Sequence, residues 1–165
     1  KIFLISILSF CFFFQQISKS EIINGKAVII DGDTIKINDT KIRLFGIDAP
    51  ENKQLCKKKF LSVLFFTLQK KYSCGKTSTI KLKKLVGTKT VRCYLEGEDR
   101  YKRKIGICYK NKININSWLV RNGLAVAYIK YSKRFVEDEI KAKKDNIGLW
   151  QGEFEMPWQW RKKNR

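Results

Sequence analysis

Short apolar runs separated by turn residues dominate the chain from residue 22 to residue 44. The runs lie at 28–30, 34–37 and 41–44, and the turns between them lie at 31–33 and 38–39. Asp-Gly and Asn-Asp favour tight turns because they tolerate the left-handed backbone conformation that hairpins need. Pro50 follows and cannot donate a hydrogen bond to a sheet. The pattern predicts a three-stranded meander that ends before Pro50.

Later segments alternate between helical and strand patterns. The predicted helices are 76–86, 115–122 and 132–145, and the predicted strands are 89–95 and 104–109. We expect Phe135, Ile140 and Ala142 to face inward in the last helix, and we interpret the Lys-rich connection 52–75, with its apolar centre at 60–66, as helical. Five short strands with helices between and after them predict an α+β, mainly β, protein: a five-stranded OB-fold Greek-key barrel with about three helices.

The first 20 residues follow a different pattern. Lys1 precedes an apolar run over residues 2–14, and Ser18 and Ser20 stand where a signal peptidase reads small residues. This predicts an export signal at 1–20 and a single domain at 21–165, with a core at 23–150 and a basic tail at 151–165. An uncleaved membrane anchor is the alternative, although the run is shorter than the roughly 20 residues needed to span a bilayer. In the tail we expect Trp158 and Trp160 to pack on the barrel and residues 161–165 to fray.

Four cysteines remain once Cys11 leaves with the signal. An even number in a chain bound for the periplasm or the extracellular space suggests two disulfides among three possible pairings. Because pairing of neighbours along the chain is favoured, we predict Cys56 with Cys74 and Cys93 with Cys108. A zinc site is the weaker alternative, since the chain has neither a CxxC pair nor a histidine.

Charge and the missing histidine narrow the function. The 165 residues contain 35 Lys and Arg against 15 acidic residues, a formal charge of +20, which points to a polyanionic partner: nucleic acid first, an anionic membrane surface second. The absence of histidine excludes Ser-His-Asp and Cys-His catalysis and HExxH zinc sites. Catalysis in this chain must therefore use carboxylates, Arg, Lys, Tyr, Cys or a metal held by oxygen.

Acidic and arginine side chains cluster in the first predicted meander. Asp33 lies on the turn of IDGDT, Arg43 ends the third strand, and Asp48 and Glu51 follow in GIDAPE. Carboxylates that converge from a turn and a strand end make a site for a hard cation such as Ca²⁺. Arg offers a planar fork of donors that matches phosphate oxygens. Together these residues supply what phosphodiester hydrolysis without histidine requires.

The ordered motifs IDGDT, IRLFGIDAPE, DRYKR, WLVRNGLAVAY and GLW resemble the staphylococcal nuclease domain over most of residues 23–150. The resemblance implies an OB-like barrel and calcium-dependent cleavage of both DNA and RNA, largely independent of sequence, to 5′-hydroxyl and 3′-phosphate ends. It implies calcium ligation by Asp33, Asp48 and the carbonyl of Ala49. It implies catalysis by Glu51, as general base or its water-orienting equivalent, and by Arg43 and Arg103 on the scissile phosphate. It implies substrate contacts from Tyr101, Tyr128 and Tyr131.

Departures and alternatives accompany this resemblance. Ala49 stands where many relatives carry Thr, Lys102 where many carry Gly, and residues 53–74 look like an insertion. Asp99 is an alternative, purely structural partner for Arg103. A catalytically inactive nucleic-acid-binding OB module is the competing function, and a binder of membrane surfaces or other polyanions is a third. We expect a monomer with no stable membrane insertion after the signal is removed.

Overall fold

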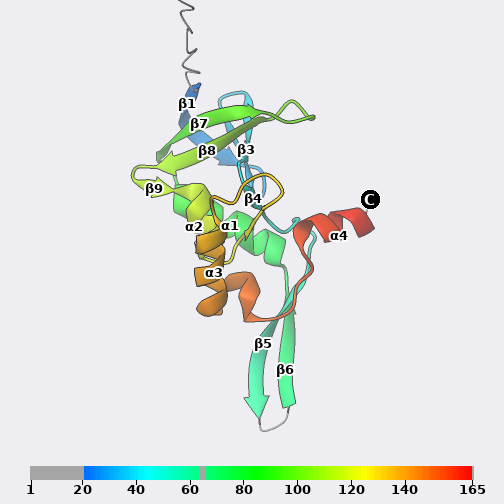
Figure 1. Cartoon of the computed structure of the whole chain (residues 1–165). Coiled ribbons are helices and arrows are strands. Elements are labelled where there is room, and N and C mark those ends of the chain that lie inside the picture. Colours follow the sequence, from blue (N-terminus) through cyan, green and yellow to red (C-terminus); the bar gives the residue numbers. More distant parts are fainter. Residues whose placement is uncertain (1–20, 64–65, 165) are drawn as a thin grey trace, which may run out of the picture.

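Five strands close into a barrel in the computed structural model, which describes residues 21–63 and 66–164 (Figure 1). The predicted signal at 1–20 lies outside this part. The barrel strands are β1 (Ile22–Ile29), β2 (Thr34–Ile37), β3 (Thr40–Leu44), β7 (Thr90–Glu98) and β8 (Lys104–Lys110). Their order is β3-β2-β1-β7-β8, with the short β9 (Ile113–Asn114) beyond β8. A parallel pairing of β3 with β8 closes the barrel, so the predicted fold class is confirmed.

Alternating burial explains why these segments form strands around one core. Along β7, Val91, Cys93 and Leu95 point inward while their neighbours are exposed. Ile35 of β2 lies opposite Ile42 of β3, and both are fully buried. Period-two alternation of this kind places one face of each strand on the core. The predicted meander of β1, β2 and β3 is antiparallel, as expected.

Four α-helices pack around the barrel in the described part of the chain. They are α1 (Cys74–Val86), α2 (Ile115–Arg121), α3 (Val136–Lys144) and α4 (Pro157–Lys163), with a 3₁₀ turn at Gly148–Gln151. β4 (Ile47–Asp48) pairs with β10 (Val126–Ala127) between the barrel and these helices. No helix in the described part of the chain has the length and apolar character needed to span a bilayer.

The inward face of α3 differs from the prediction. The helix begins at Val136 instead of residue 132, and Ile140 is 49% exposed, whereas Phe135, Glu139 and Ala142 are buried. Residues four and seven positions after Phe135 share its face of a helix, while a residue five positions later points away. The inward side chain of this turn is therefore Glu139, whose carboxylate accepts a hydrogen bond from the Ala127 amide at 3.2 Å.

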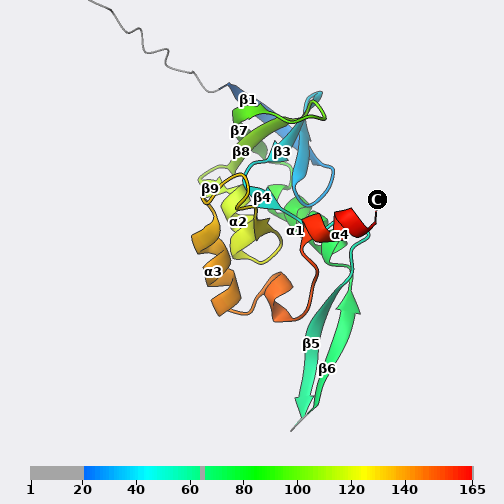
Figure 2. The same cartoon turned by 45° about the vertical axis from the view of Figure 1, so that its right-hand side comes forward.

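The connection predicted to be helical is a β-hairpin. Strands β5 (Cys56–Val63) and β6 (Phe66–Tyr72) pair antiparallel, with Cys56 opposite Tyr72 and Leu61 opposite Leu68. Residues 64–65, the rest of the predicted apolar centre, lie outside the described residues. The helical prediction was wrong because the apolar run has no barrel surface to pack on, while aromatic and β-branched residues support an extended pair. Both figures show this hairpin running away from the barrel (Figures 1 and 2).

Both predicted disulfides are present. Cys93 and Cys108 join β7 to β8 inside the barrel core, and Cys56 and Cys74 close the base of the hairpin. Cys56, Cys74 and Leu149 belong to a second, smaller apolar cluster that includes the partly buried Trp158. The C-terminal tail folds onto this cluster.

The end of the chain is ordered further than predicted. α4 extends to Lys163 and is capped at Asn164, so the expected fraying from residue 161 is wrong for the described residues of the tail. Pro157 stands at the start of α4, where its missing N–H is tolerated.

Candidate active site

A cleft of about 900 Å³ runs along the end of the barrel, between the β3 and β4 strands, the loop joining β7 to β8, and α4. Nearly all of the predicted catalytic, metal and substrate residues line it. These lining residues are Asp33, Arg43, Ala49, Glu51, Tyr101, Arg103, Tyr128 and Tyr131. Asp48 lies beneath the cleft floor with a fully buried side chain. The fold thus gathers residues from positions 33 to 131 into one place.

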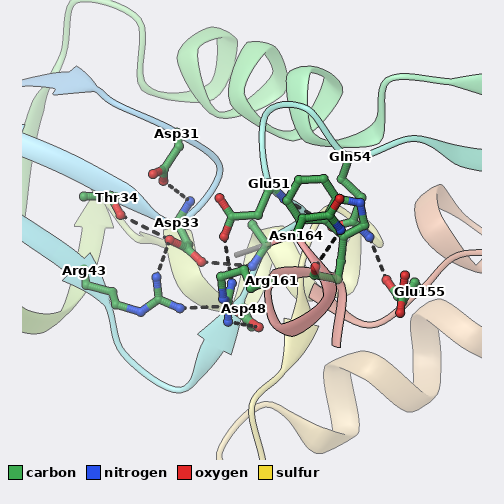
Figure 3. A network of polar contacts seen from close by, with 12 residues as sticks. Asp31, Asp33, Thr34, Arg43, Asp48, Glu51, Gln54, Glu155, Arg161 and Asn164 are labelled. Atoms are coloured by element: carbon green, nitrogen blue, oxygen red, sulfur yellow. Dashed lines mark hydrogen bonds and ion pairs between the residues drawn. The ribbon is translucent and has the colours of Figure 1, made fainter. Parts of the chain in front are cut away.

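Arg43 links the two predicted metal-binding aspartates. Its Nη1 donates to Asp33 Oδ1 at 2.8 Å, and its Nη2 donates to Asp48 Oδ1 at 2.8 Å (Figure 3). Pairing of β2 with β3 places Arg43 opposite Thr34, directly after Asp33. The second oxygen of Asp33 accepts from the backbone amide of Ala49 at 3.0 Å. The guanidinium group of Arg43 on β3 thereby connects the turn that carries Asp33 to β4, which carries Asp48.

A second arginine, missed by the sequence analysis, comes from α4. Arg161 grips Asp48 through two donors, Nη1 at 3.0 Å and Nη2 at 2.8 Å, and its Nη1 also donates to Glu51 Oε1 at 2.9 Å. Burial disfavours the charged guanidinium, but Asp48 and Glu51 outweigh it and raise the pKa of Arg161 above its usual value. A sequence signal existed: Trp158 precedes Arg161 by three residues, so on a helix the two share a face.

Gln54 holds the loop that carries Glu51 against the C-terminal segment. The Gln54 side chain accepts from the Glu51 amide at 3.3 Å and donates to the Glu155 carbonyl at 2.7 Å. It is fully buried. The side chain of Glu51, in contrast, is 38% exposed and lines the cleft. Glu51 therefore has a fixed backbone and an accessible side chain.

Asp31, also missed, adds another carboxylate to the same cleft. Its Oδ1 accepts from the Asp33 amide at 3.0 Å, and its side chain lines the cleft. Burial, followed by the negative charge of Asp33, raises the pKa of Asp31 to about 6. The signal lay in the DGD turn itself, which carries two carboxylates of which the sequence analysis selected one.

The charges of this cluster leave room for a cation. The carboxylates of Asp31, Asp33, Asp48 and Glu51 face the guanidinium groups of Arg43 and Arg161, four negative charges against two positive ones when Asp31 is ionised. Among the described residues, no three acidic or sulfur side chains converge on one point, since arginines stand between them. The donors are nonetheless all oxygen, and two uncompensated negative charges match a hard divalent cation.

Arg103 reaches the cleft from the loop that joins β7 to β8. Its Nε donates to Asp99 Oδ2 at 2.8 Å, and its Nη1 lies 3.5 Å from the Thr34 hydroxyl. Burial would raise the pKa of Asp99, but the hydrogen bonds from Arg103 and the Tyr101 amide lower it. Arg103 therefore forms an ion pair with Asp99 and still lines the same cleft as Arg43. Among the described residues, the two arginines have no carboxylate partner in common.

The three predicted tyrosines differ in their surroundings. Tyr101 and Tyr131 are 59% and 63% exposed, and the Arg103 guanidinium lies 5.6 Å from the Tyr101 ring centroid. Tyr128 packs edge-on against Tyr131 and stacks on Trp158, with ring centroids 5.3 Å apart and planes 7° from parallel. Trp158 therefore covers one face of Tyr128, and the aromatic wall of the cleft is partly made by α4.

Known proteins similar to this chain include members of the staphylococcal nuclease family. Residues 41–152 match the family described as staphylococcal nuclease homologue, a range that includes Arg43, Asp48, Glu51 and Arg103 but begins after Asp33. The chain is 34% identical over 148 residues to an uncharacterized endonuclease of Escherichia coli O157:H7, covering 84% of this chain and 85% of that protein.

Two other similar proteins have different lengths. The succinoglycan biosynthesis protein ExoI of Rhizobium meliloti is 33% identical over 140 residues, covering 81% of this chain and 68% of that protein. The probable staphylococcal-like nuclease CAN2 of Oryza sativa subsp. japonica is 34% identical over 143 residues, covering 85% of this chain but 34% of that protein. The chain thus spans only about a third of the plant protein.

Proposed function

The chain belongs to the staphylococcal nuclease family, and we propose that it is an exported, calcium-dependent nuclease that hydrolyses phosphodiester bonds of DNA and RNA to 5′-hydroxyl and 3′-phosphate ends. One observation carries the proposal. Arg43 joins Asp33 to Asp48 at the floor of a cleft that Arg103 also lines. Two guanidinium groups facing one cleft suit a phosphodiester gripped from both sides. Relatives named nuclease and endonuclease support the same reaction class.

In this proposal Asp33, Asp48 and the Ala49 carbonyl hold Ca²⁺. When bound, the ion polarises a phosphoryl oxygen and lowers the pKa of a coordinated water. Asp33 is 6% exposed at its side chain and Asp48 is fully buried, so both carboxylates are held by the protein frame rather than by solvent. A rigid oxygen frame with excess negative charge favours a hard cation over its hydrated state.

Glu51 and the arginines act on the substrate. Glu51 presents an accessible carboxylate at the cleft surface, the position required to take a proton from an attacking water. Arg43 and Arg103 bind the non-bridging phosphate oxygens, and their grip strengthens as negative charge develops at phosphorus. Tyr101 and Tyr131 offer exposed rings beside that phosphate for contact with sugar or base.

Arg161 has to move during this cycle. Its guanidinium binds the carboxylates of Asp48 and Glu51, the residues that would hold the cation and take the proton in this proposal. Release of Arg161 from Asp48 would leave it beside the cleft as a third cation for the substrate. The structure therefore describes a state in which an arginine balances the charge of the acidic cluster.

The cysteines support the proposed export. Two disulfides are stable in an oxidising compartment, so the periplasm or the extracellular space suits the fold. The competing function, a catalytically inactive OB module, predicts loss of a carboxylate or an arginine from the cluster, whereas Asp33, Arg43, Asp48, Glu51 and Arg103 are all in place.

The test is cleavage of single-stranded DNA by the purified protein in calcium, in EGTA, and with Glu51→Gln or Arg43→Ala in calcium. We expect cleavage to require calcium and to fall by about a hundredfold or more in each variant. Arg121→Ala is the matched control, because Arg121 pairs with Asp145 on the surface away from the cleft. Tight DNA binding by the wild type without cleavage would instead establish the inactive module.

A further inference from the structure

The β5–β6 hairpin stands apart from the barrel and has its own surface. Each of its strands pairs only with the other among the described strands, and the hairpin extends away from the body in both views (Figures 1 and 2). The Cys56–Cys74 disulfide fixes its base. A two-stranded hairpin has little stability alone, so an anchored one that projects from the domain calls for a functional explanation.

The two faces of the hairpin differ. Gln69 and Lys57 both donate to the Glu153 carboxylate, at 3.0 and 2.8 Å, which turns that face toward the C-terminal segment. On the opposite face only the base contacts the body: the Tyr72 hydroxyl lies 3.5 Å from the Gly148 carbonyl, and Cys56 packs in the second apolar cluster. Farther from the base, that face has no described partner outside the hairpin. Alternation along the strands and the pairing register place five residues on it: Lys58, Leu61, Phe66, Leu68 and Lys70.

Polar and apolar residues on this outer face are separated along the length of the hairpin. Phe66, Leu68 and Leu61 are 77%, 58% and 49% exposed and lie in the half far from the barrel. Lys58 and Lys70 lie opposite each other, nearer the disulfide. Phe66 and Lys70 are four residues apart on one strand, about 13 Å. The apolar side chains therefore lie at the far end, and the two lysines lie about 13 Å closer to the barrel. A bilayer has the same order along its normal, with acyl chains inside and headgroup phosphates outside.

We propose that the β5–β6 hairpin docks this protein on the surface of an anionic lipid bilayer, with Phe66, Leu68 and Leu61 entering the interface and Lys58 and Lys70 contacting lipid phosphates. Lys59 and Lys71 on the other face add positive charge and have no ion pair with a described carboxylate. The chain's charge of +20 strengthens the attraction to such a surface. The proposal does not depend on nuclease activity.

Other occupants fit this surface less well. Phosphates of a nucleic acid would satisfy the lysines and a base would stack on Phe66, but aliphatic Leu61 and Leu68 beside it offer no flat ring. A second copy of the hairpin would bring lysines of like charge together on both sides. A bilayer with anionic headgroups offers apolar chains to Phe66, Leu61 and Leu68 and phosphates to Lys58 and Lys70. Docked in this way, the protein keeps its cleft clear of the bilayer, because no residue of β5 or β6 lines the cleft. The helix α4, which does line it, lies away from the far end of the hairpin (Figure 1).

The experiment is cosedimentation with phosphatidylcholine vesicles prepared with and without phosphatidylglycerol. The protein is the chain from Glu21 onward, which contains every barrel strand and both disulfides. The hairpin variants are Phe66→Ser with Leu68→Ser, and Lys58→Gln with Lys70→Gln. The matched controls on α1 are Ile80→Ser, an exposed apolar residue, and Lys81→Gln with Lys84→Gln.

We expect binding to the phosphatidylglycerol vesicles alone, and a loss of about 30-fold in affinity when two hairpin lysines are removed. The serine pair should lose at least as much, while the α1 controls bind like the wild type. Equal binding by hairpin variants and controls would overturn the proposal. So would hairpin variants that lose DNA binding but keep vesicle binding, or a wild-type dimer in sedimentation equilibrium that only the hairpin variants dissociate.

Discussion

Arg43 and Arg161 bind the same oxygen of Asp48 from two very different regions of the molecule. Arg43 belongs to β3, which is hydrogen-bonded to β2 on one side and β8 on the other. Arg161 belongs to α4, a seven-residue helix whose only buried residue is Pro157. A helix this short is not stable alone and depends on its packing contacts. The Arg43–Asp48 ion pair is thus part of the barrel, whereas the Arg161–Asp48 ion pair depends on a peripheral helix and can be displaced.

This difference assigns distinct roles to chemically identical groups. An arginine held by a central strand keeps its position when its partners change, which suits a phosphate ligand that must be preorganised. An arginine on a peripheral helix can leave at small structural cost. The predictions below separate the two.

The largest expected effect is on stability when Arg43 is removed. Arg43→Ala leaves the buried carboxylate of Asp33 without its arginine, whereas Asp48 keeps Arg161, and breaking a buried ion pair typically costs about 3 kcal/mol or more of unfolding free energy. Arg161→Ala should cost only about 1 kcal/mol, because Arg43 still compensates Asp48. Urea unfolding of both variants measures the difference. Equal losses would mean that α4 is as much part of the frame as β3.

Removal of Arg161, which lowers stability, should raise the affinity for calcium. If Ca²⁺ binds Asp48, Arg161→Ala removes a competing charge and should tighten calcium binding by about tenfold, since one unit charge a few ångströms away is worth roughly 1 to 4 kcal/mol near a protein surface. Isothermal titration calorimetry of the wild type, Arg161→Ala and the surface control Arg121→Ala measures this directly. Weaker binding in Arg161→Ala would show that the arginine supports the cation site.

A smaller effect is expected from the stack that holds α4. Trp158→Ala removes the ring packed on Tyr128 and should lower the unfolding free energy by about 1 kcal/mol. It should also speed tryptic cleavage at Arg161 and Lys162, because the released helix becomes accessible. Trp160→Ala is the control on the same helix, and equal cleavage rates in the two variants would argue that Trp158 does not dock α4.

The smallest effect concerns the surface pair of Arg121 and Asp145. Both side chains are more than a third exposed, so Asp145→Asn should change the unfolding free energy by less than about 1 kcal/mol. Nuclease activity should stay at the wild-type level. A large loss of either would disqualify Arg121→Ala as a control for the cleft arginines.

Much of the barrel and most of the acidic cluster could be predicted from the sequence because their determinants are local. Alternating apolar residues specify the strands, and Asp33, Arg43, Asp48 and Glu51 lie within 19 consecutive residues that fold as one meander and its exit. Pairing of β2 with β3 then leaves little freedom in where Arg43 points. Both cysteine pairs are likewise neighbours along the chain.

The tertiary structure alone decided what α4 and the hairpin do. Arg161 meets Asp48 across 113 positions of sequence, and no local pattern states which barrel end a short basic helix will reach. That position depends on Trp158 finding the ring of Tyr128 and on Gln54 joining two distant backbones. Residues 56–72 carry an apolar run compatible with either a helix or a strand, and the outcome rests on the absence of a neighbouring surface and on the disulfide at its base. Local periodicity encodes elements that build the core, whereas elements at the periphery are placed by surfaces that exist only after the core has formed.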